Sequence, residues 1–162
     1  MRQRIKRSIK TILFLFSLGF FGFLMTGIFL TQELPVYEGT VPMTKIKDTV
    51  EVFTDQFGVP HIFANNEEDL FLVAGYIAAR ERLFQMSMVL NSVRGELASM
   101  LGDEYLSADI YLRTWRIHDI SKKITEKMDL ETKKIMEAFC QGINLWIDET
   151  SDDLPLEFRI LG

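Results

Sequence analysis

A charge-free run of hydrophobic residues near the amino terminus constrains this chain more than any other feature. Residues 1–10 contain five basic side chains and no acid, and the run from Thr11 to Leu30 contains no charged residue at all. About twenty helical residues at ~1.5 Å each span ~30 Å, the thickness of the hydrocarbon core of a bilayer. We therefore predict a transmembrane anchor or uncleaved signal at 11–30, preceded by a basic cytoplasmic tail at 1–10.

The charges around this run predict its orientation. Positive charge before an apolar segment keeps the amino terminus in the cytoplasm and places the following domain outside. A cleaved signal normally has a shorter apolar core of about 7–15 residues and small residues at its cleavage site, and Thr26–Thr31 offers no good site of this kind. We expect a single-pass cell-membrane protein with an extracytoplasmic domain, and secretion after signal cleavage is the alternative.

The rest of the chain is acidic and poor in metal ligands. The sequence has 18 Lys and Arg against 23 Asp and Glu, and five of the basic residues lie in the first ten positions. An acidic domain repels a phosphate backbone, so we expect no nucleic-acid partner. Cys140 is the single cysteine, and His61 and His118 are the two histidines. The chain therefore cannot form an internal disulfide and has few residues for a zinc site.

A linker and one domain are predicted after the hydrophobic run. Pro35, Gly39 and Pro42 punctuate the sequence over 31–46 in the manner of an extended tether. The following residues, 47–162, have the length of one domain and can bury a modest core. We therefore expect a folded unit that begins near residue 47.

The first part of this domain predicts a β-hairpin. Residues 49–53 and 59–63 alternate in polarity and are rich in β-branched side chains, and a short turn sequence separates them. Pro60 cannot donate a hydrogen bond to a ladder. It therefore predicts either the start of a strand or an edge position.

A long helix is predicted next. Asn65 and Asn66 are candidate N-caps for a helix that begins near Glu67 and has acidic residues in its first turn, where the helix dipole favours them. Apolar residues recur at helical spacing beyond this point. The helical region is expected to reach Leu101, with a break near Gly95.

Two further helices are predicted. The first runs from Asp109 to Lys123, with Asp109 and Arg113 one turn apart and so placed for an ion pair. Asp129 caps the second, which is amphipathic. Its apolar face is expected to lie in the core and consists of Ile135, Phe139, Ile143, Trp146 and Ile147.

The residue types most often used in catalysis are isolated in the sequence. His61 lies in a predicted strand with no Ser or Cys spaced to form a nucleophile pair, so a structural role is the better interpretation. His118, next to Asp119, is interpreted as part of a solvated or capping pair. Cys140 lies mid-helix without a helix N-terminus or neighbouring base to activate it, and is interpreted as a small packing residue.

The charged clusters are equally weak signals of a site. Arg80–Glu81–Arg82 interrupts an apolar helical face, and buried charges are almost always paired, so this cluster is a structural ion pair or part of a polar site. The acid pairs Glu67–Glu68 and Asp152–Asp153 point to different faces and are usually solvated. The residues by themselves show no active site.

Several short segments become informative through their shared order and spacing. They are Tyr37–Thr40, Asp55–Asn65, Ala79–Met86, Arg94–Ala98 with Leu101–Gly102, Asp109–Arg113, Ala138–Asn144 and Leu154–Phe158. Each segment alone is a weak signal. Together they resemble the amino-terminal region of the penicillin acylase family, and the resemblance gives His61 and Arg82 a role in the framework of the fold.

This resemblance implies an N-terminal-nucleophile hydrolase made as one precursor that cuts itself into an α chain and a β chain. The serine that starts the β chain is the nucleophile, its α-amino group is the base, and donors of the β chain stabilise the oxyanion. The reaction is hydrolysis of a linear amide. In the family the β chain typically starts with Ser-Asn, and that dipeptide does not occur in this sequence.

The expected fold is therefore α+β: the amino-terminal part of an αββα sandwich, with an edge hairpin followed by helices, preceded by one transmembrane helix. Residues 47–162 would be a truncated portion of the α chain. No catalytic or metal-binding residue is expected in this chain, and its substrate-binding residues are left unassigned. No cofactor is expected in the fragment, whereas the resemblance implies a structural calcium ion in the complete protein.

The expected partners are the β chain of the same precursor, the membrane and, for the complete enzyme, a small N-acyl amide such as a penicillin. This fragment alone is predicted to be inactive. The alternative is a non-catalytic, membrane-tethered accessory or binding protein that retains only the α-chain fold. The two hypotheses differ in whether the reading frame continues beyond Gly162 into a spacer and Ser-Asn.

Overall fold

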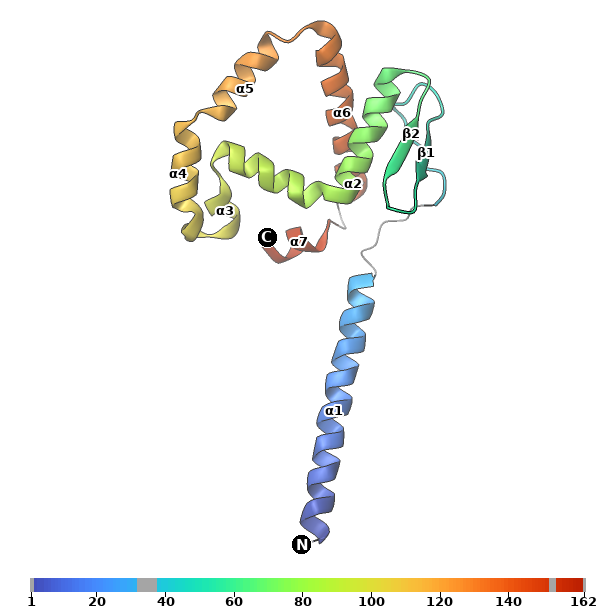
Figure 1. Cartoon of the computed structure of the whole chain (residues 1–162), viewed down its shortest axis with the longest axis vertical. Coiled ribbons are helices and arrows are strands. Elements are labelled where there is room, and N and C mark those ends of the chain that lie inside the picture. Colours follow the sequence, from blue (N-terminus) through green and yellow to red (C-terminus); the bar gives the residue numbers. More distant parts are fainter. Residues whose placement is uncertain (1, 32–37, 152–153, 162) are drawn as a thin grey trace. The chain divides into compact units, whose positions relative to one another are not determined.

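The protein is described from a computed structural model, which covers residues 2–31, 38–151 and 154–161. The chain forms two compact units, Met1–Val36 and Tyr37–Gly162. Each unit is considered by itself (Figure 1). The first contains helix α1 and the second contains a hairpin and the remaining helices.

Helix α1 overturns the prediction for the amino terminus. It runs over Arg2–Thr31 and so includes both the basic residues and the hydrophobic run. Within the described residues, no helix combines the length and the apolar character needed to cross a membrane. The predicted transmembrane helix at 11–30 and the single-pass membrane localisation are therefore wrong.

The second unit begins with the expected hairpin. Strand β1, Glu51–Thr54, pairs antiparallel with β2, Pro60–Phe63, and Val52 lies opposite Ile62. The carboxylate of Asp55 closes the turn by accepting hydrogen bonds of 2.9 Å and 3.0 Å from the amides of Phe57 and Val59. The hairpin prediction is confirmed, and β2 begins at the proline.

Helix α2, Glu67–Arg94, follows the hairpin. Its N-cap is Asn66, whose side chain accepts a hydrogen bond from the amide of Asp69, and its C-cap is Gly95 in the left-handed conformation (φ 66°). The predicted start and the predicted break are both confirmed. The helix also bends at Arg82, where the backbone leaves helical geometry (φ −146°, ψ 25°).

Five more helices and one 3₁₀ turn complete the described part of the unit. They are α3 (Leu97–Leu101), η1 (Asp103–Tyr105), α4 (Leu106–Thr114), α5 (Ile117–Glu126), α6 (Leu130–Glu149) and α7 (Leu156–Leu161). The side chain of Asp129 caps α6 as predicted, accepting from the amide of Thr132 at 2.9 Å.

The single helix predicted over Asp109–Lys123 is wrong. Two helices, α4 and α5, occupy this region, and Arg116 between them has a left-handed backbone with φ 53°. Non-glycine residues adopt this conformation uncommonly, and no glycine or proline marks the break in the sequence. The guanidinium of Arg116 pairs with Asp119 at 2.8 Å, in the first turn of α5.

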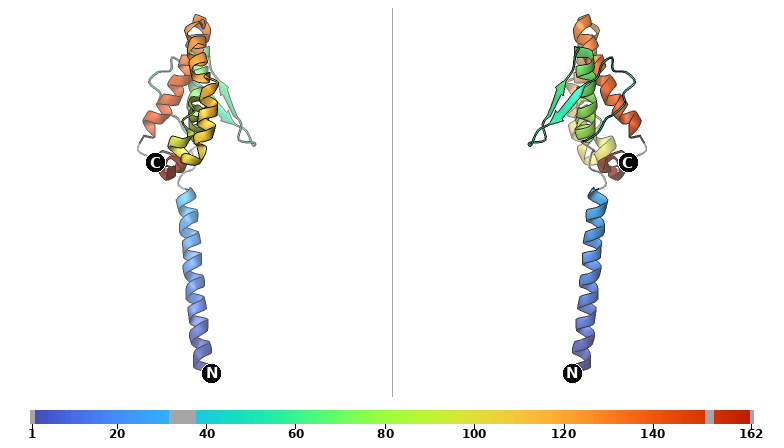
Figure 2. Two further views of the ribbon diagram at one scale, coloured as in Figure 1. Left: turned by 90° about the vertical axis from the view of Figure 1, so that its left-hand side faces the viewer. Right: turned by 90° about the vertical axis from the view of Figure 1, so that its right-hand side faces the viewer.

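Helices α2 and α6 pack closely because two glycines let their backbones meet. A Cβ added to Gly75 would lie 2.9 Å from the carbonyl carbon of Phe139, and one added to Gly142 would lie 2.7 Å from the amide nitrogen of Tyr76. Figure 2 shows α2 between the hairpin on one side and α6 on the other. The hairpin, α2 and α6 therefore form three successive layers.

The core lies along this central helix. Val73, Tyr76 and Ile77 form its centre, each no more than 5 % exposed. Partly buried residues from three other segments pack around them: Met43, Ile46, Val50, Ile62, Leu145 and Trp146. The apolar face predicted for α6 is half-buried, whereas the fully buried positions of that helix are the small residues Ala138 and Gly142.

Candidate functional site

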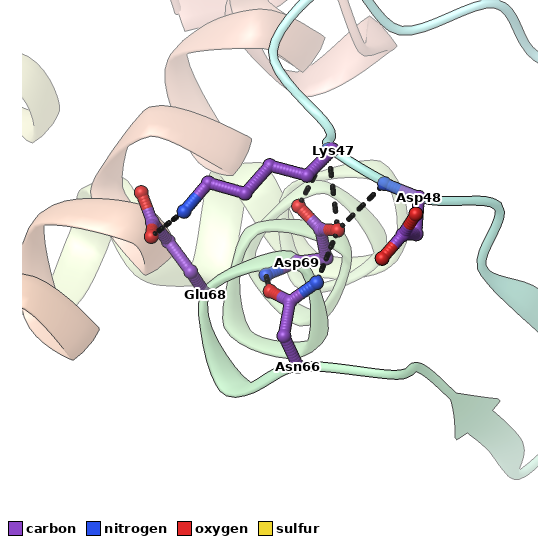
Figure 3. Close-up of polar contacts among 5 residues, drawn as sticks. All are labelled: Lys47, Asp48, Asn66, Glu68 and Asp69. Atoms are coloured by element: carbon purple, nitrogen blue, oxygen red, sulfur yellow. Dashed lines mark hydrogen bonds and ion pairs between the residues drawn. The ribbon is translucent and has the colours of Figure 1, made fainter.

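A buried carboxylate organises the polar centre of the second unit. Asp69, in the first turn of α2, is 1 % exposed. Its two oxygens accept hydrogen bonds from the amide of Lys47 at 3.0 Å and 3.2 Å, and one of them also accepts from the amide of Asp48 at 3.0 Å. The side-chain amide of Asn66 donates a further bond at 2.7 Å (Figure 3). Every one of these donors is part of the chain itself.

The surroundings of Asp69 keep it ionised. Burial disfavours the charge and is the largest single influence on its pKa. Hydrogen bonds from the Lys47 amide, the Asn66 side chain and the Asp48 amide act in the opposite direction and together outweigh burial. The pKa of Asp69 is therefore lower than that of an ordinary aspartate.

A second buried carboxylate joins α4 to the start of α3. Asp109 is 4 % exposed and accepts hydrogen bonds from the amides of Leu97 at 2.9 Å and Ala98 at 2.7 Å. The Nε of Arg113 donates to the carbonyl oxygen of Gly95 at 2.9 Å. The predicted Asp109–Arg113 ion pair is replaced by these two contacts, because both side chains bind backbone groups at the α2–α3 junction.

A third polar contact lies at the end of α6. The hydroxyl of Tyr76 donates to the carboxylate of Glu149 at 2.7 Å, and burial followed by this bond raises the pKa of Tyr76. The ring of Tyr76 meets the ring of Trp146 edge to face, with centroids 5.4 Å apart. The contact ties the last turn of α6 to the middle of α2.

The two histidines and the cysteine are not brought together as a catalytic group. His61 lies on β2, with its Nε2 3.3 Å from a carboxylate oxygen of Asp55. His118 is exposed on α5, and its neighbour Asp119 pairs with Arg116 instead. In the described part of the chain, neither histidine is hydrogen-bonded to a serine, threonine or cysteine.

Cys140 corrects a prediction. It is exposed on α6, so it is not the buried packing residue expected from its position next to Phe139. The reason is the rotation of the helix, because Ala138 and Gly142 face α2 and place the residue between them toward solvent. The half-buried Phe139 also shows that this face of α6 is only partly covered.

The charged clusters form ion pairs where the structure describes them. Arg80 and Glu81 form an ion pair at 3.0 Å, which confirms one of the two interpretations of that cluster, and Arg82 marks the bend of α2. Glu68 pairs with Lys47. Asp152–Asp153 lies outside the described residues.

No metal centre can be assigned in the described residues, since no three His, Cys, Asp or Glu side chains gather there as ligands. The carboxylates of Asp69 and Asp109 are instead occupied by backbone amides, which leaves them poorly suited to bind a cation. These residues do not fit a calcium site. The calcium ion expected for the complete protein stays a prediction.

The arrangement also leaves apolar side chains in solvent. On α5, Ile117, Ile120 and Ile124 are 37 %, 51 % and 58 % exposed. Their spacing places them on one side of the helix, and we call these three residues the α5 stripe. At the end of α4, Tyr111 and the capping residue Trp115 are also exposed, with their ring centroids 6.0 Å apart.

Sequence analysis missed the roles of Asp69, Asp109 and Tyr76. The available signal for Asp69 was the Asn-x-x-Asp spacing of residues 66 and 69, which is the spacing of a capping box. Its bonds to the amides of Lys47 and Asp48 join positions more than twenty residues apart in sequence. No local pattern reports such contacts.

Comparisons with known proteins agree with these elements. The family model for penicillin amidase matches residues 49–162. The penicillin acylase 2 proenzyme of Pseudomonas sp. (strain SE83) is 31 % identical over 133 residues, which is 82 % of this chain and 17 % of that protein. The penicillin G acylase of Escherichia coli is 32 % identical over 117 residues, which is 70 % of this chain and 14 % of that protein.

A third relative is named for a different substrate from the two penicillin acylases. The acyl-homoserine lactone acylase QuiP of Pseudomonas fluorescens (strain Pf0-1) is 28 % identical over 124 residues, which is 76 % of this chain and 15 % of that protein. The chain thus spans about a sixth of the length of the curated relatives it matches.

A solved structure shares the fold. The thermostable penicillin G acylase from Alcaligenes faecalis superposes with a TM-score of 0.63 at 29 % identity, over 70 % of this chain and 62 % of that chain. Most of the matched residues lie in the second unit, because the match covers 70 % of the chain and the first unit ends at Val36. Sequence and structure lead to one conclusion: the chain belongs to the penicillin amidase family.

Proposed function

We propose that this chain is the amino-terminal part of an amidohydrolase precursor. The reaction is hydrolysis of a linear amide, in which the C–N bond breaks, water supplies a hydroxyl to the acyl carbon and a proton to the nitrogen, and a carboxylic acid and an amine leave. The relatives named above are acylases, which supports this reaction class. This chain supplies framework, and we assign it no catalytic side chain.

The observation that carries the proposal is the exposed α5 stripe. Three isoleucines on one side of a short helix lie in solvent, together with the ring pair on α4. A contiguous apolar surface is a candidate interaction site. A chain that spans about a sixth of its relatives' length has a candidate partner in the rest of such a precursor. We propose that this β-chain portion covers the stripe.

The proposed chemistry follows the family resemblance. A serine at the start of the β chain attacks the acyl carbon, and its free α-amino group takes the hydroxyl proton and then delivers it to the departing amine. An oxyanion hole in the β chain stabilises the tetrahedral intermediate. An αββα sandwich has two stacked β-sheets. We propose that strands of the β chain complete these sheets and extend the β1–β2 hairpin.

The proposed substrates are N-acyl amides. The names of the relatives point to penicillins and to acyl-homoserine lactones. Both are amides that join an acyl chain to a small amine, so the shared chemistry is the amide bond. We propose this class and leave the acyl group unassigned, because the names of the relatives differ in the substrate that they give.

The test starts from the genomic reading frame after the codon for Gly162. We expect a spacer followed by Ser-Asn. Expression of the complete frame should give two chains and should release amine from penicillin G or from an N-acyl homoserine lactone. Replacement of that serine by alanine should abolish both the cleavage and the amine release, while the precursor stays folded by circular dichroism.

Two results would contradict the proposal. One is a genuine stop codon with no Ser-Asn sequence downstream, which would favour a non-catalytic protein that keeps only this fold. The other is amide hydrolysis by the purified 162-residue chain alone that is lost on Cys140→Ala or His61→Ala. Such a result would place a catalyst within this chain.

A further inference from the structure

The segment that precedes the hairpin is held to the core in an unusual way. Residues 43–50, which we call the strap, form neither helix nor strand. Three strap side chains, Met43, Ile46 and Val50, nevertheless pack against the buried centre of the core. The strap therefore lies over α2 without a ladder of backbone hydrogen bonds to hold it.

A single carboxylate provides the backbone anchor of the strap. The amides of Lys47 and Asp48 both donate to Asp69, and both lie between the packed residues Ile46 and Val50 (Figure 3). Asp69 itself is fixed by the first turn of α2 and by Asn66. Since one oxygen of Asp69 accepts from three different donors, the charge of the carboxylate is central to the contact.

Charged groups from three elements face this anchor. The strap contributes Lys47 and Asp48, α2 contributes Glu67 and Glu68, and α6 contributes Glu131 and Lys134, which line an open hollow beside it. The Lys47 ammonium pairs with Glu68, and this exposed pair adds little to the strength of the anchor. The surrounding charge is therefore mixed, and the buried Asp69 is the group whose state governs the contact.

We propose that the strap is an acid-releasable clamp, in which neutralisation of Asp69 frees residues 43–50 from α2 while the α2–α6 pair stays folded. This inference does not depend on amide hydrolysis.

The direction with pH follows from the geometry. A protonated Asp69 has a neutral acid group that attracts the Lys47 and Asp48 amides more weakly. Its pKa is held below the ordinary aspartate value, so the clamp is intact at neutral pH and opens as the pH falls through that lowered value. The close approach of α2 and α6 at Gly75 and Gly142 does not depend on pH in this way, because it is formed by backbone atoms, which do not titrate.

Limited proteolysis of the full chain at neutral pH tests the clamp. Trypsin can cut after Lys45 and Lys47 in the strap and after Lys133 and Lys134 in α6. We expect Asp69→Asn to speed cleavage in the strap by about tenfold or more, the change expected when hydrogen bonds to a charged acceptor are weakened. Cleavage in α6 and the helical circular dichroism should stay as in the wild type.

The matched control is Asp129→Asn, which changes an aspartate that also accepts a backbone amide, as the cap of α6, but lies on the surface. This variant should leave cleavage of the strap unchanged. Equal strap cleavage in wild type and folded Asp69→Asn would overturn the clamp. So would an Asp69→Asn chain that loses its helices, because the carboxylate would then support the whole unit.

Hydrogen exchange of the wild-type chain tests the same point without a variant. After correction for intrinsic exchange, the amides of Lys47 and Asp48 should lose protection as the pH falls, at a pH where amides of α2 and α6 remain protected. Loss of protection in the strap and in both helices together at every pH would overturn the clamp.

Discussion

Gly142 shows how much of this fold depends on a single missing side chain. A Cβ there would overlap the backbone of α2 at Leu72 and Tyr76. We expect Gly142→Ala to lower the free energy of unfolding by roughly 1–3 kcal/mol, the usual cost of overpacking, even though alanine favours a helix by about 1 kcal/mol. Urea unfolding followed by fluorescence of Trp115 and Trp146 measures this change.

The control for this substitution is Gly22→Ala in α1. No heavy atom lies within 4 Å of a Cβ added at that position. The urea midpoint of the second unit should therefore not change. A stable Gly142→Ala chain with the wild-type midpoint would contradict the close approach of α2 and α6.

Single residues also show where prediction from sequence stops. The Pro60 strand start, the Asn66 cap and the Gly95 break are local features, and each is confirmed. The burial of Asp109 is not local, because its partners at Leu97 and Ala98 belong to another helix. Sequence spacing instead predicted a pair with Arg113, the neighbour one turn away.

At the scale of elements, the contact between α2 and α6 has a predictable response to alkaline pH. Burial, and then the bond to Glu149, raise the pKa of Tyr76 above the ordinary value of about 10. Above pH ~10 the unfolded chain loses the tyrosine proton while the folded chain keeps it, so stability falls as the pH rises. Tyr76→Phe should remove the part of this stability loss that is due to Tyr76.

Urea unfolding between pH 8 and about 11 checks this prediction. Below pH ~10, Tyr76→Phe should be less stable by about 1 kcal/mol for the lost hydrogen bond, and the gap should narrow above it. Tyr111→Phe, at an exposed tyrosine, should follow the wild type throughout. A gap that stays constant with pH would show that Tyr76 ionises as readily in the folded chain as in the unfolded one.

The α5 stripe gives a second prediction for an element. We expect Ile120→Lys with Ile124→Lys to reduce binding of a hydrophobic dye several-fold and to change the free energy of unfolding by no more than about 0.5 kcal/mol, because both side chains are exposed. Ser121→Lys adds a charge to the same helix without removing an apolar group, and should leave dye binding unchanged.

A large loss of stability in the double variant would contradict this prediction. A loss of more than about 2 kcal/mol in the double variant would mean that the stripe is buried by the chain itself. The proposed β-chain contact would then lose its main support. Amphipathic spacing does not decide between these cases, because it marks an apolar face without naming what covers it.

At the scale of the whole molecule, local patterns and family resemblance predicted different things. Periodicity and capping residues placed the hairpin, α2 and α6, whereas the order of the short segments identified the family. The structure explains why two of those segments occur together: Asp109–Arg113 binds the backbone of Arg94–Ala98. The predicted membrane-spanning segment is not found, because no helix among the described residues is both long and apolar enough to cross a bilayer.

The response of the whole chain to acid combines several carboxylates. Hydrogen bonds or ion pairs lower the pKa of Asp55, Asp119 and Asp129, chiefly through the Val59 amide, the Arg116 side chain and the Thr132 amide. Amide bonds outweigh burial to lower the pKa of Asp69 as well. The unfolded chain takes up protons before the folded chain does, so the stability present above pH ~4 is lost as the pH falls through these lowered values.

When urea unfolding is measured from pH 6 to about 2, the urea concentration at the midpoint should therefore start to fall near pH ~4. Asp69→Asn should make this fall shallower, because one of the carboxylates that binds a proton on unfolding is gone. A parallel series at high salt separates this effect from repulsion between positive charges. Salt screens that repulsion but has little effect on the buried hydrogen bonds of Asp69. A midpoint that stays constant down to pH ~3 would mean that these carboxylates titrate alike in the folded and unfolded chains.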